Sequence, residues 1–435
     1  MNLFNLSLRL KGFPFAKACT DFNTISDIAS ADYLPYIEKQ RQEIVAYHLK
    51  HNSFYRGLTE GIHTAKWDAL PIVTKKDLQR PLQDRLSDGF NTHNCHIHKT
   101  SGSSGTPFIF AKNKYCHALT WAGFKHHYSQ FNLDLNHSKQ ARFYGIPLNQ
   151  KGYYKERLKD AVSNRYRFSV FDLSDAAFKK TLHKFSNTTF DYINGYTSAI
   201  VQFAKFLHRE KIVLTSVCPS LKACIVTSEM LFEDDKRLLE QALGIPVLNE
   251  YGAAELGLIA FLDKTGQWRV NSEDLYVEII DDNNRVLPYG ETGRVVITAL
   301  YNKAHPFIRY DLGDIGSLSK SSTVKHPILE TLTGRTSDIA KLPSGKTAAG
   351  LTFYYITKTI IEDTSVVKEF IIEQLELGRF KISYVSTEGL SEAKKQAIQT
   401  AFDTYLEPGL QLDFEQKKEL KRTKSGKLKQ FTSLV

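Results

Sequence analysis

Between residues 96 and 251 the chain alternates short apolar stretches of strand type with amphipathic stretches of helix type. Parallel neighbouring strands need helical crossovers, so this alternation predicts a largely parallel sheet that is covered by helices. The strands are predicted at 96–100, 141–148, 166–171, 191–195, 221–228 and 246–251, and the helices at 113–131, 175–185, 197–210 and 233–243.

The regions on either side have a different pattern. Residues 30–90 favour helices, and DALPIVTKKDL within them predicts a turn followed by a helix start, with Thr74 and Asp77 as a capping box. After residue 265, short strands and turn residues predict a small antiparallel β subdomain. The order strand, strand, helix, strand after residue 334 predicts a small α+β domain. We therefore expect an α/β chain with a large N-terminal domain over 1–333 and a C-terminal domain over 334–435, joined by a hinge.

Composition narrows the class of protein. Hydrophobic residues make up 42% and charged residues 24%, which predicts folded cores and excludes general disorder. No apolar stretch is long enough to span a bilayer, and the N-terminal residues resemble an amphipathic helix more than a targeting segment, so a cytoplasmic protein is expected. The net charge of +10, partly in the basic tail 417–430, favours an anionic partner, for which a nucleotide is as good an explanation as nucleic acid.

Cysteines and histidines predict neither disulfides nor a metal centre. The five cysteines contain no C-x-x-C pair. In the strand around residue 96, alternation sends His96 and His98 to one face and Cys95 to the other, so ordinary packing is the better interpretation.

The segment Thr100–Pro107, with the sequence TSGSSGTP, is expected between a strand and a helix. Glycines let a backbone turn tightly and aim N–H groups inward, and the serine and threonine hydroxyls add donors, which suits a polyphosphate. A flexible surface linker is the plainer alternative. The loop lacks the Gly-Lys-Ser/Thr ending of a P-loop, and Ser344–Thr347 does not supply one, since Ala340 stands where the opening glycine would be needed.

The loop resembles the phosphate loop of the acyl-adenylate-forming superfamily, which contains acyl-CoA synthetases and adenylation domains. Four later segments resemble further motifs of that superfamily and occur in the same order. They are Asn249–Glu255 (NEYGAAE), Phe307–Asp314 (FIRYDLGD), Gly334–Asp338 (GRTSD) and Lys424–Lys427 (KSGK). DALPIVTKKDL and the modest length resemble the branch of phenylacetate–CoA ligase and the ligases of capsular polysaccharide biosynthesis.

The resemblance implies ATP and Mg²⁺ as cofactors and a carboxylic acid that is activated as its adenylate. It implies that Lys427 and Glu255 are catalytic and that Glu255 also binds the metal. The residues that it implies for nucleotide binding are Ser101, Gly102, Ser103, Ser104, Gly105, Thr106, Glu250, Tyr251, Gly252, Asp314 and Arg335. The acid is expected between the helix after the loop and the strand ends, with Trp121, Phe124, Tyr144 and Tyr196 as candidates, although core packing explains these aromatic residues equally well.

The acyl acceptor stays open at this point. Ser337 stands where the hinge of the superfamily commonly has Asp or Lys, and LPSGKTAAGLTFYY does not clearly match the segment that accommodates pantetheine. CoA is therefore one expected acceptor, and a sugar amine or hydroxyl in polysaccharide biosynthesis is the alternative. A non-catalytic module that binds a polyanion through the basic tail is the alternative of another class.

Overall fold

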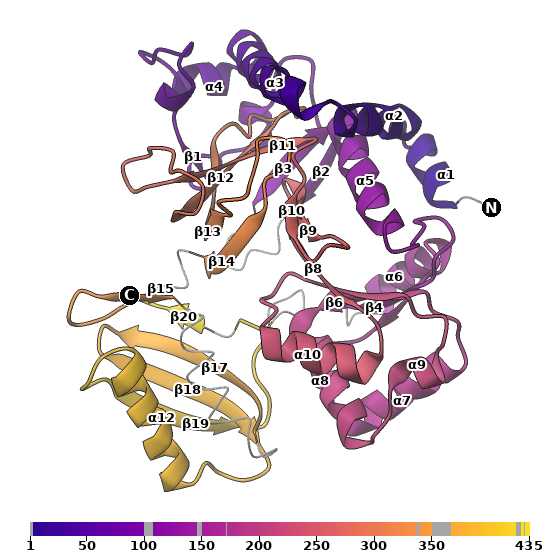
Figure 1. Ribbon diagram of the computed structural model, residues 1–435, viewed down its shortest axis with the longest axis vertical. Helices are drawn as coiled ribbons and strands as arrows, with labels where there is room; N and C mark the ends of the chain where they lie inside the picture. The colour runs from indigo at the N-terminus through magenta and orange to yellow at the C-terminus, as the bar shows by residue number, and fades with distance from the viewer. Residues whose placement is uncertain are drawn as a thin grey trace. The chain divides into compact units, whose positions relative to one another are not determined.

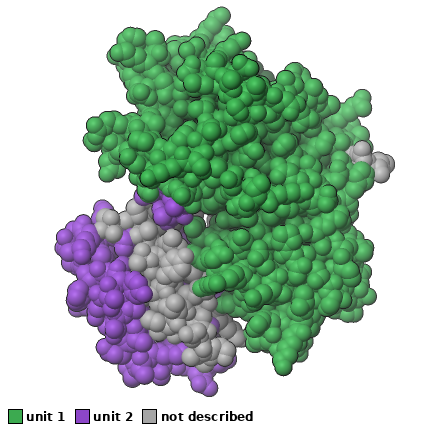
Figure 2. All heavy atoms as spheres, viewed as in Figure 1, with its two compact units in different colours: residues 1–312, 317–330 green, residues 313–316, 331–435 purple. Residues whose placement is uncertain are grey.

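The computed structural model describes residues 3–99, 108–145, 150–170, 172–335, 339–349, 367–422, 428–429 and 431–435 (Figure 1). The chain forms two compact units, 1–312 with 317–330, and 313–316 with 331–435 (Figure 2). The boundary expected at residue 333 lies within β14, and a hinge motion of the C-terminal part stays a prediction.

A seven-stranded sheet carries most of the first unit, with the strand order β10-β9-β8-β7-β6-β4-β5. The strands from β8 to β5 are parallel, and β9 and β10 continue the sheet in antiparallel pairing. The prediction of a largely parallel, helix-covered α/β sheet is therefore confirmed. The strands are β4 (Gln140–Phe143), β5 (Arg165–Phe168), β6 (Tyr192–Tyr196), β7 (Ala223–Thr227), β8 (Val247–Ala253), β9 (Gly257–Leu262) and β10 (Trp268–Val270).

Helices cover both faces of this sheet. On one face, Phe178, Phe203 and Leu239 belong to a large apolar core that α7, α8 and α10 share. On the other face, Tyr128 of α5 packs with Ile225 and neighbouring strand residues. The helices of this layer are α5 (Lys114–Ser129), α6 (Gln150–Val162), α7 (Asp175–Ser186), α8 (Thr197–Arg209), α9 (Leu214–Val217) and α10 (Glu233–Leu243).

Local sequence signals explain where some of these helices begin and end. Acidic residues fill the first turn of α10, where the helix dipole favours negative charge, and Gly244 ends the helix at a φ of 73°. A Cβ atom at Gly244 would lie 2.3 Å from Thr215 Oγ1, so both space and backbone conformation require glycine. Ser174 caps α7, because its side chain accepts a hydrogen bond from the Ala177 N–H.

A second sheet has five strands and belongs to the first unit except for residues 313–316 of β13 and 331–335 of β14. N-terminal helices pack against it. Its order is β1-β13-β12-β11, with β14 paired to β13. Ile44 and Tyr55 of the helical layer pack against Ile308. The strands are β1 (Val73–Thr74), β11 (Leu275–Ile280), β12 (Thr292–Ala299), β13 (Tyr310–Leu318) and β14 (Leu329–Arg335), and the helices are α1 (Leu3–Leu10), α2 (Phe15–Ser26), α3 (Ser30–His51), α4 (Ser53–Leu58), η1 (Trp67–Ala69) and η2 (Leu82–Arg85).

The second unit contains a four-stranded sheet in the order β19-β18-β17-β20 and a short hairpin, β15-β16. Phe402 of α12 packs edge-on against Phe380 of β18, with ring centroids 5.7 Å apart. The predicted order of strand, strand, helix and strand is confirmed for β17 (Val367–Glu376), β18 (Arg379–Ser386), α12 (Glu392–Tyr405) and β19 (Gln411–Lys417). The remaining strands are β15 (Ile339–Lys341), β16 (Thr347–Ala349) and β20 (Phe431–Ser433).

One element was not predicted, and three local predictions are wrong. Helix α6 was not predicted, although the parallel pair β4 and β5 requires a crossover. The loop 100–107 is followed by a second strand and not directly by a helix, since β2 (Cys95–Lys99) and β3 (Ile109–Asn113) form an antiparallel pair. The Thr74 N–H donates to the Asp77 carboxylate and the Asp77 N–H to Thr74 Oγ1, as predicted, but a turn follows them and not a helix. Trp268–Val270 belongs to the seven-stranded sheet and not to the β subdomain.

Candidate functional site

Glu255 and Tyr310, which belong to two different predicted motifs, meet directly in the first unit. Glu255 lies in the turn between β8 and β9 and is only 6% exposed. The hydroxyl of Tyr310, at the start of β13, donates a hydrogen bond of 3.0 Å to Glu255 Oε1. A buried carboxylate that is held by one hydroxyl is oriented and keeps further acceptor capacity.

A buried lysine lies behind the same turn. Lys112 of β3 is 3% exposed, and its ammonium donates to Thr120 Oγ1 at 3.3 Å. Burial lowers the pKa of Lys112, while the nearby Cys116, Asp274 and Glu255 act in the opposite direction. Lys112 is not among the site residues predicted from the sequence. A lysine that directly follows the apolar residues 108–111 was the signal that could have identified it.

Gly257 makes this arrangement possible. Its φ is 97°, a conformation that residues with a Cβ atom rarely adopt. A Cβ atom there would lie 2.4 Å from Thr120 Cγ2 and 3.2 Å from Lys112 Nζ. Glycine therefore allows α5 and β3 to approach the turn that carries Glu255.

The predicted nucleotide residues of β8 point in different directions. The Tyr251 ring is buried, with its centroid 6.0 Å from that of Trp268. The Glu250 side chain is half-buried, and its Oε2 accepts a hydrogen bond of 2.8 Å from Tyr128 of α5. Burial raises the pKa of Glu250, whereas hydrogen bonds from Tyr128 and Thr227 and the charge of Arg142 lower it. At Gly252, a Cβ atom would lie 2.8 Å from the Gly257 carbonyl oxygen.

Several predicted site residues lie outside the described residues. These are Ser101, Gly102, Ser103, Ser104, Gly105, Thr106, Ser337 and Lys427. Asp314 is described, is 9% exposed and belongs to the short piece 313–316 of the second unit. Arg335 ends β14, but its side chain is not described.

Arg85 anchors the strand that follows the loop 100–107. Its side chain is 1% exposed, and Nη2 donates to the Ile109 carbonyl at 2.9 Å. Nη1 lies 2.5 Å from Nε2 of the buried His305. Burial and the charge of Arg85 hold the pKa of His305 well below its usual range, so the neutral imidazole accepts this bond.

Arg309 fixes the backbone directly before Tyr310. Its φ of 46° is unusual for a residue other than glycine. The guanidinium lies 3.4 Å from the carboxylate of Glu278, with both side chains 1% exposed, and donates to the carbonyls of Asp68 and Leu70. These contacts join the start of β13 to β11, to η1 and to the residue directly after η1, and so hold Tyr310 in place.

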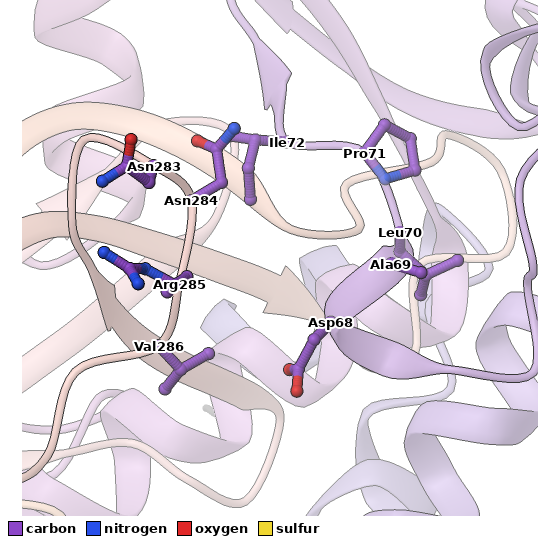
Figure 3. Close-up of a pocket in the computed structure, with 9 residues that line it drawn as sticks. All are labelled: Asp68, Ala69, Leu70, Pro71, Ile72, Asn283, Asn284, Arg285 and Val286. Atoms are coloured by element: carbon purple, nitrogen blue, oxygen red, sulfur yellow. The ribbon is translucent and has the colours of Figure 1, made fainter.

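A surface hollow of about 490 Å³ lies elsewhere in the first unit (Figure 3). Residues 68–72 form one wall and residues 283–286 the other, with the side chains of Asp68 and Arg285 at its rim. None of the predicted site residues lines it.

A divalent metal ion would need ligands from the acidic side chains of this unit. Over the described ranges, no three His, Cys, Asp or Glu side chains come together in a way that could hold a metal ion. Mg²⁺ commonly needs only one or two protein carboxylates when phosphates and waters complete its shell, so the single carboxylate of Glu255 fits this ion. In the part of the chain that the structure describes, no helix combines the length and apolar character needed to cross a membrane.

Sequence comparison identifies two curated relatives over a limited segment. Phenylacetate-coenzyme A ligase of Pseudomonas putida is 32% identical over 124 residues, which are 27% of this chain and 28% of that protein. The enzyme of the same name from Thermus thermophilus is 28% identical over 128 residues, or 29% of its length. The chain thus matches less than a third of the length of either relative. No family model matches it.

Solved structures match over a much larger part of the chain. A 2-hydroxyisobutyryl-CoA ligase, in the postadenylation state with an acyl-AMP, has a TM-score of 0.69 and 17% identity, covering 93% of this chain and 90% of the other. Its open conformation, in complex with 2-HIB-AMP and CoA, has a TM-score of 0.58. An anthranilate CoA ligase in complex with anthranoyl-AMP has a TM-score of 0.53 over 76% of this chain.

Proposed function

We propose that this chain is an ATP-dependent ligase that activates a carboxylic acid and transfers the acyl group to CoA. Its fold and its matching segment bear out its resemblance to the acyl-adenylate-forming superfamily. In the first step a carboxylate oxygen attacks the α-phosphorus, the bond to the β-phosphate bridge breaks, and pyrophosphate leaves. In the second step the acceptor sulfur attacks the acyl carbon, and AMP leaves.

The observation that carries this proposal is the hydrogen bond from Tyr310 to Glu255. It joins two motifs that are far apart in sequence, within a fold shared with ligases that were crystallised with acyl-adenylates. An oriented, buried carboxylate suits a site that must organise charge before the reaction begins.

The residue roles follow from chemistry and from the motif order. Ser101, Gly102, Ser103, Ser104, Gly105 and Thr106 would hold the leaving phosphates, and Lys427 would bridge the acid and the α-phosphate. Glu255 would hold Mg²⁺, which neutralises phosphate charge when it is bound. Tyr251, with Gly252, would bind adenine, while Asp314 and Arg335 would bind the ribose.

Exchange of labelled pyrophosphate into ATP tests the first step. The assay contains Mg²⁺ and a panel of aryl, fatty, short-chain and amino acids, and omits any acceptor. Glu255→Gln should lower exchange by about 10²–10³-fold, as expected for a lost preorganised electrostatic contact. Glu291→Gln, which removes an exposed carboxylate from the same unit, is the matched control and should exchange like the wild type.

Lys427 separates an enzyme from a module that binds polyanions. Lys427→Ala should abolish exchange, while Lys421→Ala, which removes an exposed charge from the same basic tail, should not. A polyanion-binding module would lose a little affinity in both variants and would show no exchange. Equal activity of the two variants would overturn the role of Lys427.

The acceptor is tested separately. Formation of acyl-CoA from the adenylated acid supports thioester formation, and acyl transfer to an amino sugar without CoA supports the alternative in polysaccharide biosynthesis. A cytoplasmic location belongs to the same proposal.

A further inference from the structure

Four polar or aromatic residues form a row along the carboxyl ends of adjacent parallel strands. Thr227 pairs in register with Tyr196 on one side and with Glu250 on the other. Phe143 pairs with Gly195, so the next residue, Tyr144, lies beside Tyr196, and their ring centroids are 4.6 Å apart. In-register residues of parallel strands share one face of the sheet. Tyr144, Tyr196, Thr227 and Glu250 are called the carboxyl-edge row below.

Helix α5 contacts this row at Glu250. Tyr128 of α5 is 6% exposed and donates the 2.8 Å hydrogen bond to Glu250 Oε2. Its ring also packs against Phe124 and Tyr192, with centroids 5.8 and 5.9 Å away. The carboxylate of Glu250 is therefore set in an aromatic wall, and it keeps part of its surface exposed.

Arg142 lies two residues before Tyr144, on the same face of β4. Its guanidinium lies 4.1 Å from the centroid of the Tyr144 ring, and Nη1 makes a long hydrogen bond of 3.5 Å to Gln140 Oε1. Nε is buried and has no hydrogen-bond partner among the described residues. Arg142 acts on Glu250 through its charge and not through a hydrogen bond. A carboxylate and an arginine donor without a partner thus share one wall.

The position of the row favours a ligand. In open sheets of parallel strands, ligands bind outside the carboxyl ends of the strands. A purely apolar ligand would take water from the partly exposed carboxylate of Glu250 without offering it a hydrogen bond, which is costly. A ligand with a donor group would use the free acceptor capacity of the carboxylate.

We propose that the carboxyl-edge row binds the polar end of the substrate, and that the substrate is a carboxylic acid with a hydrogen-bond donor, an amine or a hydroxyl, remote from its carboxylate. This inference rests on the proposed function. It assigns the Glu250 side chain to recognition of the acid, whereas the motif resemblance implied nucleotide binding.

Matched acids test the proposal in the pyrophosphate exchange assay. Phenylacetate is compared with its para-hydroxy and para-aminomethyl derivatives, and hexanoate with its ω-hydroxy and ω-amino derivatives. The wild type should prefer a donor-bearing acid in kcat/KM by at least about 100-fold, because a site built for a donor rejects an analogue that lacks one. A preference for the plain acid in both series would overturn the inference while leaving the proposed function intact.

Variants of Glu250 and Tyr128 assign the selectivity to the row. Glu250→Gln should lower the preference for the amine at least about 10-fold, and Glu250→Leu should reverse it in favour of the plain acid. Tyr128→Phe removes only the hydroxyl that bonds to Glu250 and should lower the preference several-fold, so it carries the test if the Glu250 variants fail to fold. Glu291→Gln is the control.

The KM for ATP separates the two roles of Glu250. Under the proposal, Glu250→Gln changes selectivity among acids and not the KM for ATP. A raised KM for ATP with unchanged selectivity would overturn the proposal and return Glu250 to the nucleotide. If no acid supports exchange and ATP does not bind to the wild type, the proposed function itself fails.

Discussion

Two ion pairs, one in each unit, differ strongly in their exposure to solvent. In the first unit, Arg309 and Glu278 form an ion pair with both side chains 1% exposed, and Lys112 is 3% exposed. In the described part of the second unit, Arg379 and Asp413 pair at 2.9 Å with exposures of 44% and 45%. The Arg309–Glu278 pair therefore lies in the interior, and the Arg379–Asp413 pair lies on a solvated sheet face.

The difference in exposure between the two ion pairs follows from the side of the sheet on which each pair lies. Strand β18 alternates, so Phe380 and Ile382 are buried while Arg379 and Lys381 face water. Glu278 lies in β11 and Arg309 directly before β13, in the sheet against which the N-terminal helices pack, so both charged groups are desolvated. Removing a charged side chain from water costs free energy. The surrounding protein then holds the charged group in one orientation, which suits a binding site.

The largest expected effect is at the buried ion pair. Arg309→Met leaves Glu278 buried without its partner, and the free energy of unfolding should fall by about 3–5 kcal/mol in urea denaturation. Arg309→Met combined with Glu278→Met should recover part of this loss, because no unpaired charge then remains. A loss below about 1 kcal/mol in the single variant would show that water reaches Glu278 and would weaken the contrast between the units.

His48 should make the stability of the first unit depend on pH. Burial lowers the pKa of His48 to about 4, below the value of about 6.5 expected in the unfolded chain. The unfolded state therefore binds more protons between these values, so stability falls as the pH drops from about 6.5 to about 4. At about 1.4 kcal/mol for each pKa unit, the loss reaches about 3 kcal/mol.

The pH effect is measured by unfolding wild type and His48→Gln across this range. The variant should show a flatter profile, whereas replacing the exposed His63 should leave the profile unchanged. Parallel profiles for wild type and His48→Gln would contradict the prediction.

Tyr310→Phe tests the buried hydrogen bond to Glu255 in the candidate functional site. It removes the hydroxyl that bonds to Glu255, and the free energy of unfolding should fall by about 1 kcal/mol. In pyrophosphate exchange, we expect the KM for MgATP to rise more than the KM for the acid, since Glu255 is oriented by this bond. Equal changes in both constants would indicate a general structural effect.

The smallest effect is expected at the exposed pair of the second unit. Arg379→Ala should lower the free energy of unfolding by less than about 1 kcal/mol, and high salt should reduce the difference further. A loss as large as that of Arg309→Met would remove the distinction between the two units.

Elements with a strong local pattern were predictable, and elements with a weak one were not. The helices predicted over 113–131, 175–185, 197–210 and 233–243 correspond to α5, α7, α8 and α10. Local start signals are visible in two of them, the Ser174 cap of α7 and the acidic first turn of α10. Helix α6 has the polar sequence QKGYYKERLKDAV and no clear apolar stripe, so only the parallel pairing of β4 and β5 reveals that a crossover is needed. Strand β3 is short and ends in a lysine and an asparagine, which do not indicate a buried strand. Its last four residues are nevertheless buried.

The sequence by itself determined the alternation that produces a parallel sheet, the order of elements in the second unit and the order of the candidate motifs, because periodicity, capping and turn chemistry are local. Only the tertiary structure brought Tyr310 to Glu255, buried Lys112 behind their turn, and aligned Tyr144, Tyr196, Thr227 and Glu250. These arrangements depend on which strands become neighbours and in which register, and that choice is made by packing between residues far apart in the chain.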